Sequence, residues 1–260
     1  MNLGFDGKTY KMASTHQKEW GSKLIAELKL EGMENVLDLG CGDGVLTAQL
    51  AMLVPQGRAV GVDFSQSMIE TAKQHSESNL SFELLDINQL AYEDMFDVAF
   101  SNATLHWIKD HANLLRRVWR ALRPGGIIRF NFAADGNCAT FNQVIREVIT
   151  GNKYADLFRQ FEWPWYMPKI DDYRVLIGQF TFAELNVWGE NADRYFPDSD
   201  AMIRWIDQPS LLPFLPYIPT ARRETFRAEV IARMIDETRQ KDGRCFETFR
   251  RIHVFAKKER

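Results

Sequence analysis

Cysteine is scarce in this chain of 260 residues, and its pattern excludes a common group of metal and redox sites. The three cysteines, Cys41, Cys138 and Cys245, are odd in number and far apart, and no CxxC pair is present. Cysteine-based zinc and thiol-redox motifs use such pairs. We therefore expect no metal, and a reducing compartment such as the cytoplasm.

Long apolar runs and an excess of positive charge are also missing. The most apolar run, LLPFLPYIP at 211–219, contains three prolines, and it is far shorter than the ~20 apolar residues that cross a membrane. The N-terminus, MNLGFDGKTYKMAS, lacks the apolar core of a signal peptide. The 32 basic and 35 acidic side chains give a net charge of −3. Since no basic excess could neutralise a phosphate backbone, we expect neither a membrane nor nucleic acid as a partner.

What the chain does contain is an alternation of helices and strands. A helix begins near Ser14, and Gln17 three residues later completes a capping-box pattern. Short apolar strands are predicted at 35–39, 58–63, 80–85, 96–101 and 126–132, with helical patterns between them, including one at 111–122. This alternation predicts a doubly wound, mostly parallel α/β sheet, which binds ligands at the carboxyl ends of its strands.

The second half of the chain has a different character. Helices are predicted at 140–150, 171–177, 199–206 and 221–239, and further strands at 182–188 and 251–256. We expect an α/β core at 1–134. We expect 135–260 to form a helical cover that also supplies the last two strands of the same seven-stranded sheet.

The strongest local signal is VLDLGCGDG at 36–44, a glycine loop that follows a strand and opens a helix. Gly40 and Gly42 allow unusual backbone angles and close ligand approach, and the following helix start offers free N–H groups. The loop reads G-x-G-x-G, not the dinucleotide pattern G-x-G-x-x-G. Asp38 and Asp43 would repel a pyrophosphate and would suit an ammonium or sulfonium. As a ligand of this loop, a nucleoside that carries an amino acid is therefore favoured, and NAD is disfavoured.

Two further carboxylates end the next two strands. Asp63 lies 23 positions after the first loop glycine, about the spacing at which an acidic residue meets a ribose diol. Asp86, in LLDIN at 84–88, can accept a hydrogen bond from an adenine amino group. Phe64, Met68 and Ile87 could pack against the adenine faces. Taken singly, each of these side chains could equally be a helix cap or part of the core.

The ordered set of motifs resembles a class I S-adenosylmethionine-dependent methyltransferase. The glycine loop, Asp63, Asp86 and SNATLHW at 101–107 fall on successive strand ends. Within that superfamily the chain is most similar to the trans-aconitate methyltransferase group, through SNATLHWIKDH at 101–111, FAELNVW at 182–188 and MIRWI at 202–206. It resembles biotin-pathway malonyl-carrier and juvenile hormone acid methyltransferases more weakly. All three groups methylate carboxylates.

The resemblance implies a role for each matching residue in binding S-adenosylmethionine. Gly40 and Gly42, with Cys41 between them, should line its methionine part, and Asp38 should face its ammonium group. Asp63 should hold the ribose, and Asp86 and Ile87 should hold the adenine. Asn102 and Ala103 should lie beside the methionine amino group, and Gln17 should help to close the site. The segment up to Gln17 is a candidate lid.

His106 and Trp107 are the candidate catalytic residues. His106 could act as a base or hydrogen-bond donor, and Trp107 could face the sulfonium through its ring; alternatively, both are local packing residues. A carboxylate acceptor is already ionised at neutral pH and needs no base. Nothing like an Asp-Pro-Pro-Tyr motif, typical of amino methyltransferases, follows the fourth strand. We therefore expect O-methylation of a small carboxylic acid.

Several alternatives stay open at this stage. The trans-aconitate group tends to carry an arginine near Leu212 and Pro213, where this chain reads LLPFL, so a more apolar acid is possible. A nitrogen or carbon acceptor is a second possibility. A nicotinamide-dependent oxidoreductase, or a non-catalytic protein that kept the nucleoside pocket, are weaker ones. The chain is expected to act as a monomer or a homodimer.

Overall fold

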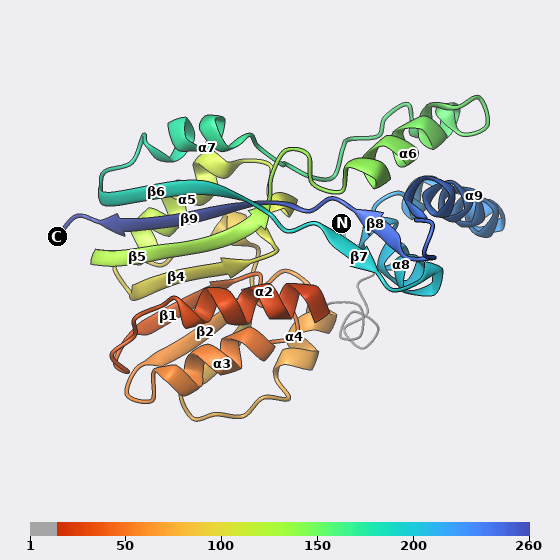
Figure 1. Cartoon of the computed structure of the whole chain (residues 1–260). Helices are drawn as coiled ribbons and strands as arrows, with labels where there is room; N and C mark the ends of the chain where they lie inside the picture. The colour runs from red at the N-terminus through yellow and green to blue at the C-terminus, as the bar shows by residue number, and fades with distance from the viewer. Residues whose placement is uncertain (1–14) are drawn as a thin grey trace. The chain divides into compact units, whose positions relative to one another are not determined.

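The central feature of the structure is one seven-stranded sheet. The computed structural model describes residues 15–260, apart from the side chains of 15–18 and 209. The strand order is β3-β2-β1-β4-β5-β9-β6 (Figure 1). These strands are β1 (Asn35–Leu39), β2 (Arg58–Asp63), β3 (Leu80–Leu84), β4 (Phe96–Asn102), β5 (Leu122–Ala133), β6 (Phe182–Asn191) and β9 (Arg250–Lys258). Strands β1 to β5 pair in parallel and β9 is antiparallel to β5, which confirms the predicted fold class.

Helices cover both faces of this sheet because its inner strands are apolar on both sides. Val36 packs with Leu24 and Leu50 from one layer of helices, whereas the next residue, Leu37, packs with Leu114 from the other layer. Successive side chains of a strand point to opposite faces, so one buried strand serves both layers. The helices are α2 (Thr15–Ala26) and α3 (Val45–Leu53) in the first layer, and α5 (His111–Ala121) and α7 (Ile170–Ile177) in the second (Figure 1).

The boundary between α5 and β5 differs from the sequence prediction. Helix α5 ends at Ala121, and β5 begins at Leu122, four residues before the strand that we predicted. The buried ammonium of Lys258 donates to the carbonyls of Trp119 (2.9 Å) and Leu122 (2.6 Å). A cation at this position stabilises the last carbonyls of the helix. Because Lys258 is far away in the chain, no local sequence pattern around residue 122 reveals where the helix ends.

The chain divides into two compact units, and the sheet unit comprises, among the described residues, 15–135, 165–190 and 251–260. The other unit comprises Gly136–Pro164 and Asn191–Arg250. Its elements are α6 (Ala139–Thr150), α8 (Ser199–Trp205), a π-helical turn (Ile206–Ser210), α9 (Thr220–Thr238) and the antiparallel strands β7 (Arg194–Phe196) and β8 (Cys245–Glu247).

Aromatic side chains and one buried carboxylate organise the second unit. Phe141 of α6 meets Trp205 of α8 edge to face, with 5.9 Å between ring centroids. The fully buried Glu247 accepts hydrogen bonds from the backbone N–H groups of Thr140 (3.2 Å) and Phe141 (2.9 Å), at the start of α6. Strands β7 and β8, three residues each, were not predicted. In residues 15–260, no helix is both long and apolar enough to cross a membrane.

Candidate active site

The glycine loop lies at the carboxyl end of β1, as predicted. The N–H groups of Gly40 and Cys41 both donate to the carbonyl of Val62, at 2.8 and 3.0 Å, and Cys41 is buried. Gly40 has φ 73°, and a Cβ there would lie 2.0 Å from Thr104. Gly42 has φ 54°, and a Cβ there would meet nothing within 4 Å. Packing requires the first glycine, whereas the second faces open space that a ligand can enter.

Asp63 ties the end of β2 to this loop. Its carboxylate accepts hydrogen bonds from the N–H of Gly42 at 3.1 Å and from the N–H of Ser65 at 2.9 Å. The side chain is buried, and burial raises the pKa of Asp63 although these hydrogen bonds oppose the shift. The glycine loop and Asp63, which the sequence predicted to form one ligand site, are therefore in direct contact.

Asp38 lies beneath the loop on β1 and is only 2% exposed. Its carboxylate accepts a hydrogen bond from the Thr47 hydroxyl at 2.7 Å. Burial, together with the nearby charge of Asp63, raises the pKa of Asp38 to about 7, even though the bond from Thr47 lowers it. Two buried carboxylates close together make this edge of the sheet attractive to a cationic group.

The carboxylate of Asp86 lies at the end of the third strand and caps a short 3-10 helix. Its Oδ1 accepts from the backbone N–H of Asn88 at 2.8 Å and from the Asn88 amide at 3.0 Å. Met68 and Ile87 are buried, and Ile87 belongs to the core beneath α5. Phe64 is 49% exposed. Of the three apolar residues expected around an adenine, Phe64 alone presents much surface to solvent.

The chain leaves β4 through a strained residue. Ala103 has φ 56°, a left-handed conformation that costs a non-glycine residue about 1–2 kcal/mol. Its N–H donates to the carbonyl of Asn131 on β5 at 2.7 Å. The preceding residue, Asn102, is buried, and a Cβ on Gly21 of α2 would lie 3.1 Å from its amide nitrogen. Such strain clusters at functional sites, and helix α2 approaches this one closely.

His106 and Trp107 follow on a 3-10 turn, Leu105–Trp107. Within residues 15–260, Nδ1 of His106 is buried and has no hydrogen-bond partner. Burial, helped by the Arg251 guanidinium, lowers the pKa of His106 to about 3. The ring of Trp107 meets that of Trp165 edge to face at 5.7 Å. His106 is therefore neutral near pH 7 and is a weak base.

His111, which we did not single out from the sequence, positions this turn. Its Nε2 lies 2.9 Å from the carbonyl of Leu105, and its Nδ1 lies 3.0 Å from the Tyr173 hydroxyl. A carbonyl can only accept, so Nε2 carries the proton and Nδ1 accepts from the tyrosine. Burial lowers the pKa of His111 to about 4, which keeps the imidazole neutral.

Strands β5 and β9 add a buried polar cluster that sequence reasoning also missed. Arg251 donates through Nε to the amide oxygen of Asn131 at 2.9 Å, and its guanidinium lies 4.6 Å from the ring centre of Trp20 on α2. The cluster continues to His253, 2.9 Å from the Asn131 amide, and to Arg129. The residues are about 120 positions apart in the chain, so no local pattern relates them.

Two of the sequence expectations, Gln17 and the candidate lid, concern residues that the structure does not fully describe. The side chain of Gln17 lies outside the described residues, as does most of the segment expected to be a lid. Across the part of the chain that the structure describes, no group of three or more His, Cys, Asp or Glu is placed to hold a metal ion. The other candidate residues gather at the carboxyl ends of β1, β2, β3 and β4, where the strand order brings them together.

This fold, with a glycine loop and acidic strand ends, defines the class of S-adenosylmethionine-dependent methyltransferases. A family model described as a methyltransferase domain matches residues 30–167, and the chain belongs to that family. The class, the fold and the methyl donor that the sequence resemblance implied are thereby confirmed.

Curated relatives extend the match over nearly the whole chain. A trans-aconitate 2-methyltransferase of Acidovorax sp. (strain JS42) is 25% identical over 98% of both chains. One of Deinococcus radiodurans is 31% identical over 74% of both chains. The fold is also that of solved structures. A putative methyltransferase from Bacillus halodurans has a TM-score of 0.61 at 16% identity, over 92% of this chain and 99% of that one. A Haemonchus contortus phosphoethanolamine N-methyltransferase 2 bound to S-adenosyl-L-methionine has a TM-score of 0.62 at 17% identity, over 98% of this chain and 57% of that one.

Proposed function

We propose that this methyltransferase acts on a small carboxylic acid and forms its methyl ester. The observation that carries the proposal is the full-length similarity to trans-aconitate 2-methyltransferases, which extends beyond the methyltransferase domain into the second unit. The compound trans-aconitate is one candidate acceptor. A more apolar acid is another, because this chain reads LLPFL near Leu212 and Pro213, where the trans-aconitate group tends to carry an arginine.

The protonation state of the site supports a carboxylate acceptor. A carboxylate oxygen attacks the methyl carbon, the bond from that carbon to sulfur breaks, and the sulfur keeps the electron pair. No proton moves in this step, so no base is needed. His106, with a pKa of about 3, is a poor base for a phenol or an ammonium but does not hinder a carboxylate. The step also joins opposite charges into neutral products, which exclusion of water favours.

The roles that we propose for the donor site follow the strand ends. Asp38 holds the ammonium group, and Asp63 holds the ribose while it keeps Gly42 in place. Asp86, with Ile87, Met68 and the exposed Phe64, holds the adenine. The methionine part then lies along the open face of the glycine loop, beside Asn102 and Ala103. Gln17 and the segment before it remain the proposed lid, and His106 and Trp107 the residues nearest the methyl group.

The location and the partners of the enzyme are also part of this proposal. Three free cysteines support a cytoplasmic enzyme. The net charge of −3 supports a small molecule, not nucleic acid, as the acceptor.

A product assay tests the acceptor class. Purified enzyme is incubated with S-adenosylmethionine labelled in the methyl group and with trans-aconitate, an apolar monocarboxylic acid, a phenol or a primary amine. We expect label in the acids alone, and mild alkali should release it as methanol because methyl esters hydrolyse there. The negative control is Asp63→Asn, because we expect this substitution to weaken the binding of S-adenosylmethionine.

The outcomes separate the alternatives. Alkali-stable label in the phenol or the amine alone would overturn the carboxylate proposal. Calorimetric titration with S-adenosylmethionine, S-adenosylhomocysteine and NADH is run in parallel. It should show binding of the first two ligands, and binding of NADH alone would contradict the donor assignment.

A further inference from the structure

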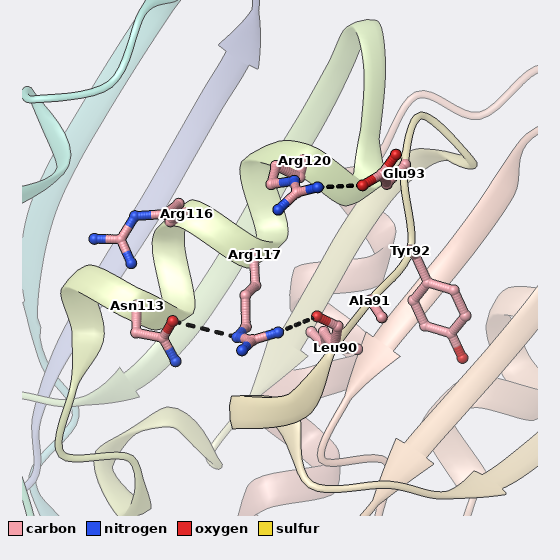
Figure 2. Close-up of a pocket in the computed structure, with 8 residues that line it drawn as sticks. All are labelled: Leu90, Ala91, Tyr92, Glu93, Asn113, Arg116, Arg117 and Arg120. Atoms are coloured by element: carbon pink, nitrogen blue, oxygen red, sulfur yellow. Dashed lines mark hydrogen bonds and ion pairs between the residues drawn. The ribbon is translucent and has the colours of Figure 1, made fainter.

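A pocket separate from the strand ends lies between α5 and the loop that leads into β4. Its volume is about 290 Å³, near the lower limit for ligand pockets, roughly 300 Å³. We call it the Arg117 pocket. Its lining residues, which Figure 2 shows as sticks, are Leu90, Ala91, Tyr92, Glu93, Asn113, Arg116, Arg117 and Arg120.

Positive charge is in excess around the Arg117 pocket. Three guanidinium groups and one carboxylate line it. Residues 116, 117 and 120 lie within about one turn of α5, so their side chains start close together. Like charges at this spacing repel one another, and an anion between them would relieve that repulsion.

The one carboxylate does not balance this charge. Glu93 pairs with Arg120, and both side chains are well exposed, at 66% and 60%. Arg117 instead donates to two neutral groups, the carbonyl of Leu90 and the amide oxygen of Asn113, the latter at 3.2 Å. Among residues 15–260, neither Arg116 nor Arg117 forms an ion pair. Two guanidinium charges at the pocket are therefore left without a carboxylate.

The positions of the three arginine side chains leave room for one anion to bind them together. In Figure 2, Arg117 reaches toward Leu90, Arg120 reaches toward Glu93, and Arg116 extends away from both. Arg116 is exposed, so its long side chain can turn toward the pocket. Exposed ion pairs are weak, so a multiply charged anion can compete with Glu93 for Arg120. Guanidinium groups bind carboxylate and phosphate oxygens through paired N–H donors.

We propose that the Arg117 pocket binds a small anion that carries at least two negative charges, either a phosphate or a polycarboxylate. The small volume excludes an extended chain from the cavity. The net charge of −3 means that the protein as a whole does not attract a polyanionic macromolecule, so the attraction is confined to the pocket. Glu93 then limits the affinity of the pocket for the anion, since it competes with the ligand for Arg120.

Calorimetric titration of the full-length protein tests the site. Inorganic phosphate and citrate are used in separate arms, at constant ionic strength and against chloride. We expect saturable binding of at least one of them, and the responding arm identifies the anion as phosphate or polycarboxylate. Arg117→Gln and Arg120→Gln should each weaken binding at least tenfold, and Glu93→Gln should tighten it. The matched control is Arg233→Gln, an exposed arginine on α9 that should leave binding unchanged.

Two results would overturn the proposal. One is the lack of saturable binding of phosphate and citrate beyond that of chloride. The other is binding that persists unchanged in Arg120→Gln and Arg116→Gln. These two side chains are exposed and their variants should fold, so they decide the question even if Arg117→Gln does not fold. If citrate binds at the proposed acceptor site instead, its binding would persist in these variants. That result would count against the pocket. None of these readings depends on methyl transfer, so they are separate from the test of the proposed function.

Discussion

Asp38 and Asp63 are buried carboxylates at neighbouring strand ends, and their chemistry depends on which ligand faces them. The pKa of Asp38 is raised to about 7 in the ligand-free protein, mainly by burial. Burial without a cationic partner disfavours the charged form, and a bound ammonium group would supply such a partner. The raised pKa is therefore what we expect of a buried carboxylate that a cationic group would stabilise in its charged form.

Donor affinity should depend on pH through Asp38. Below pH 7 the ligand-free carboxyl is mostly protonated and must release its proton to hold an ammonium. The affinity for S-adenosylmethionine should therefore fall by up to about tenfold per pH unit below 7, and should level off above it. Calorimetry at pH 6 and pH 8, in buffers of different ionisation enthalpy, measures both the affinity and the released proton.

The same shift fixes the sign of a stability change. Because the folded pKa of Asp38 lies above its ordinary value of 3.8, the ligand-free protein should lose stability as pH rises from about 4 to about 7. Asp38→Asn is the control for both measurements and should flatten the pH dependence of donor binding. An equally steep dependence in that variant would show that Asp38 does not face the donor.

Gly42 offers a second test at the scale of one residue. An alanine there incurs the left-handed backbone penalty, about 1–2 kcal/mol, but its methyl group meets no protein atom within 4 Å. Gly243 has φ 88° and equally open surroundings, in the other unit. We expect Gly42→Ala and Gly243→Ala to lose similar stability in chemical denaturation. Only Gly42→Ala should weaken donor binding, by tenfold or more; equal donor affinity in the two variants would place the ligand elsewhere.

The sequence was sufficient to place the proposed donor residues at neighbouring strand ends, because each lies just after a strand with a strong local pattern. The glycine loop, Asp63 and Asp86 each follow a recognisable apolar run, and a parallel sheet brings such strand ends together. His111, Asn131 and Arg251 could not be found in this way. His111 contacts Tyr173, and Asn131 contacts both Ala103 and Arg251. These contacts span 28 to 120 positions of the chain, and no periodicity encodes them.

At the scale of secondary-structure elements, two helices depend on single polar side chains that lie far away in the sequence. Lys258 donates to carbonyls at the end of α5, and Glu247 accepts from N–H groups at the start of α6. Each charge has the sign that complements the dipole of its helix end. Helix boundaries set from such a distance explain why the end of α5 and the start of β5 were predicted inaccurately.

The cap on α6 can be tested by substitution. Glu247→Gln keeps the shape of the side chain but removes its charge, and one amide oxygen cannot serve the donors that two carboxylate oxygens serve. We expect a loss of stability of about 1–3 kcal/mol, the cost of unsatisfied buried donors. Chemical denaturation measures it, with Glu237→Gln, an exposed residue of α9, as the matched control. If the two variants are equally stable, the bonds from Thr140 and Phe141 contribute little.

At the scale of the whole molecule, the sheet unit is made of three separate stretches of chain. The chain leaves the unit after Asp135, returns at Trp165, leaves again after Glu190 and returns at Arg251. The last return supplies β9, which lies between β5 and β6. The seven strands were predictable from their patterns, but the position of the last one inside the sheet was not, since it depends on pairing across more than a hundred residues.

Removing β9 should therefore be far more damaging than an ordinary truncation of a terminus. Deletion of 251–260 would leave β5 and β6 without the strand between them, and unpaired strand edges promote aggregation. We expect this variant to be insoluble or aggregated in size-exclusion chromatography, whereas deletion of Arg260 alone should give soluble protein. A soluble, cooperatively folding 250-residue fragment would show that the sheet is complete without β9.

The position of β9 also determines the order in which the nascent protein can fold. Translation proceeds from the N-terminus, so the second unit leaves the ribosome complete while the sheet still lacks an interior strand. Among the strands described, β6 borders only β9, and it is exposed as a single strand until β9 emerges. The sheet can therefore be completed only after β9 has been synthesised, and until then the incomplete sheet is the species that a chaperone would need to protect.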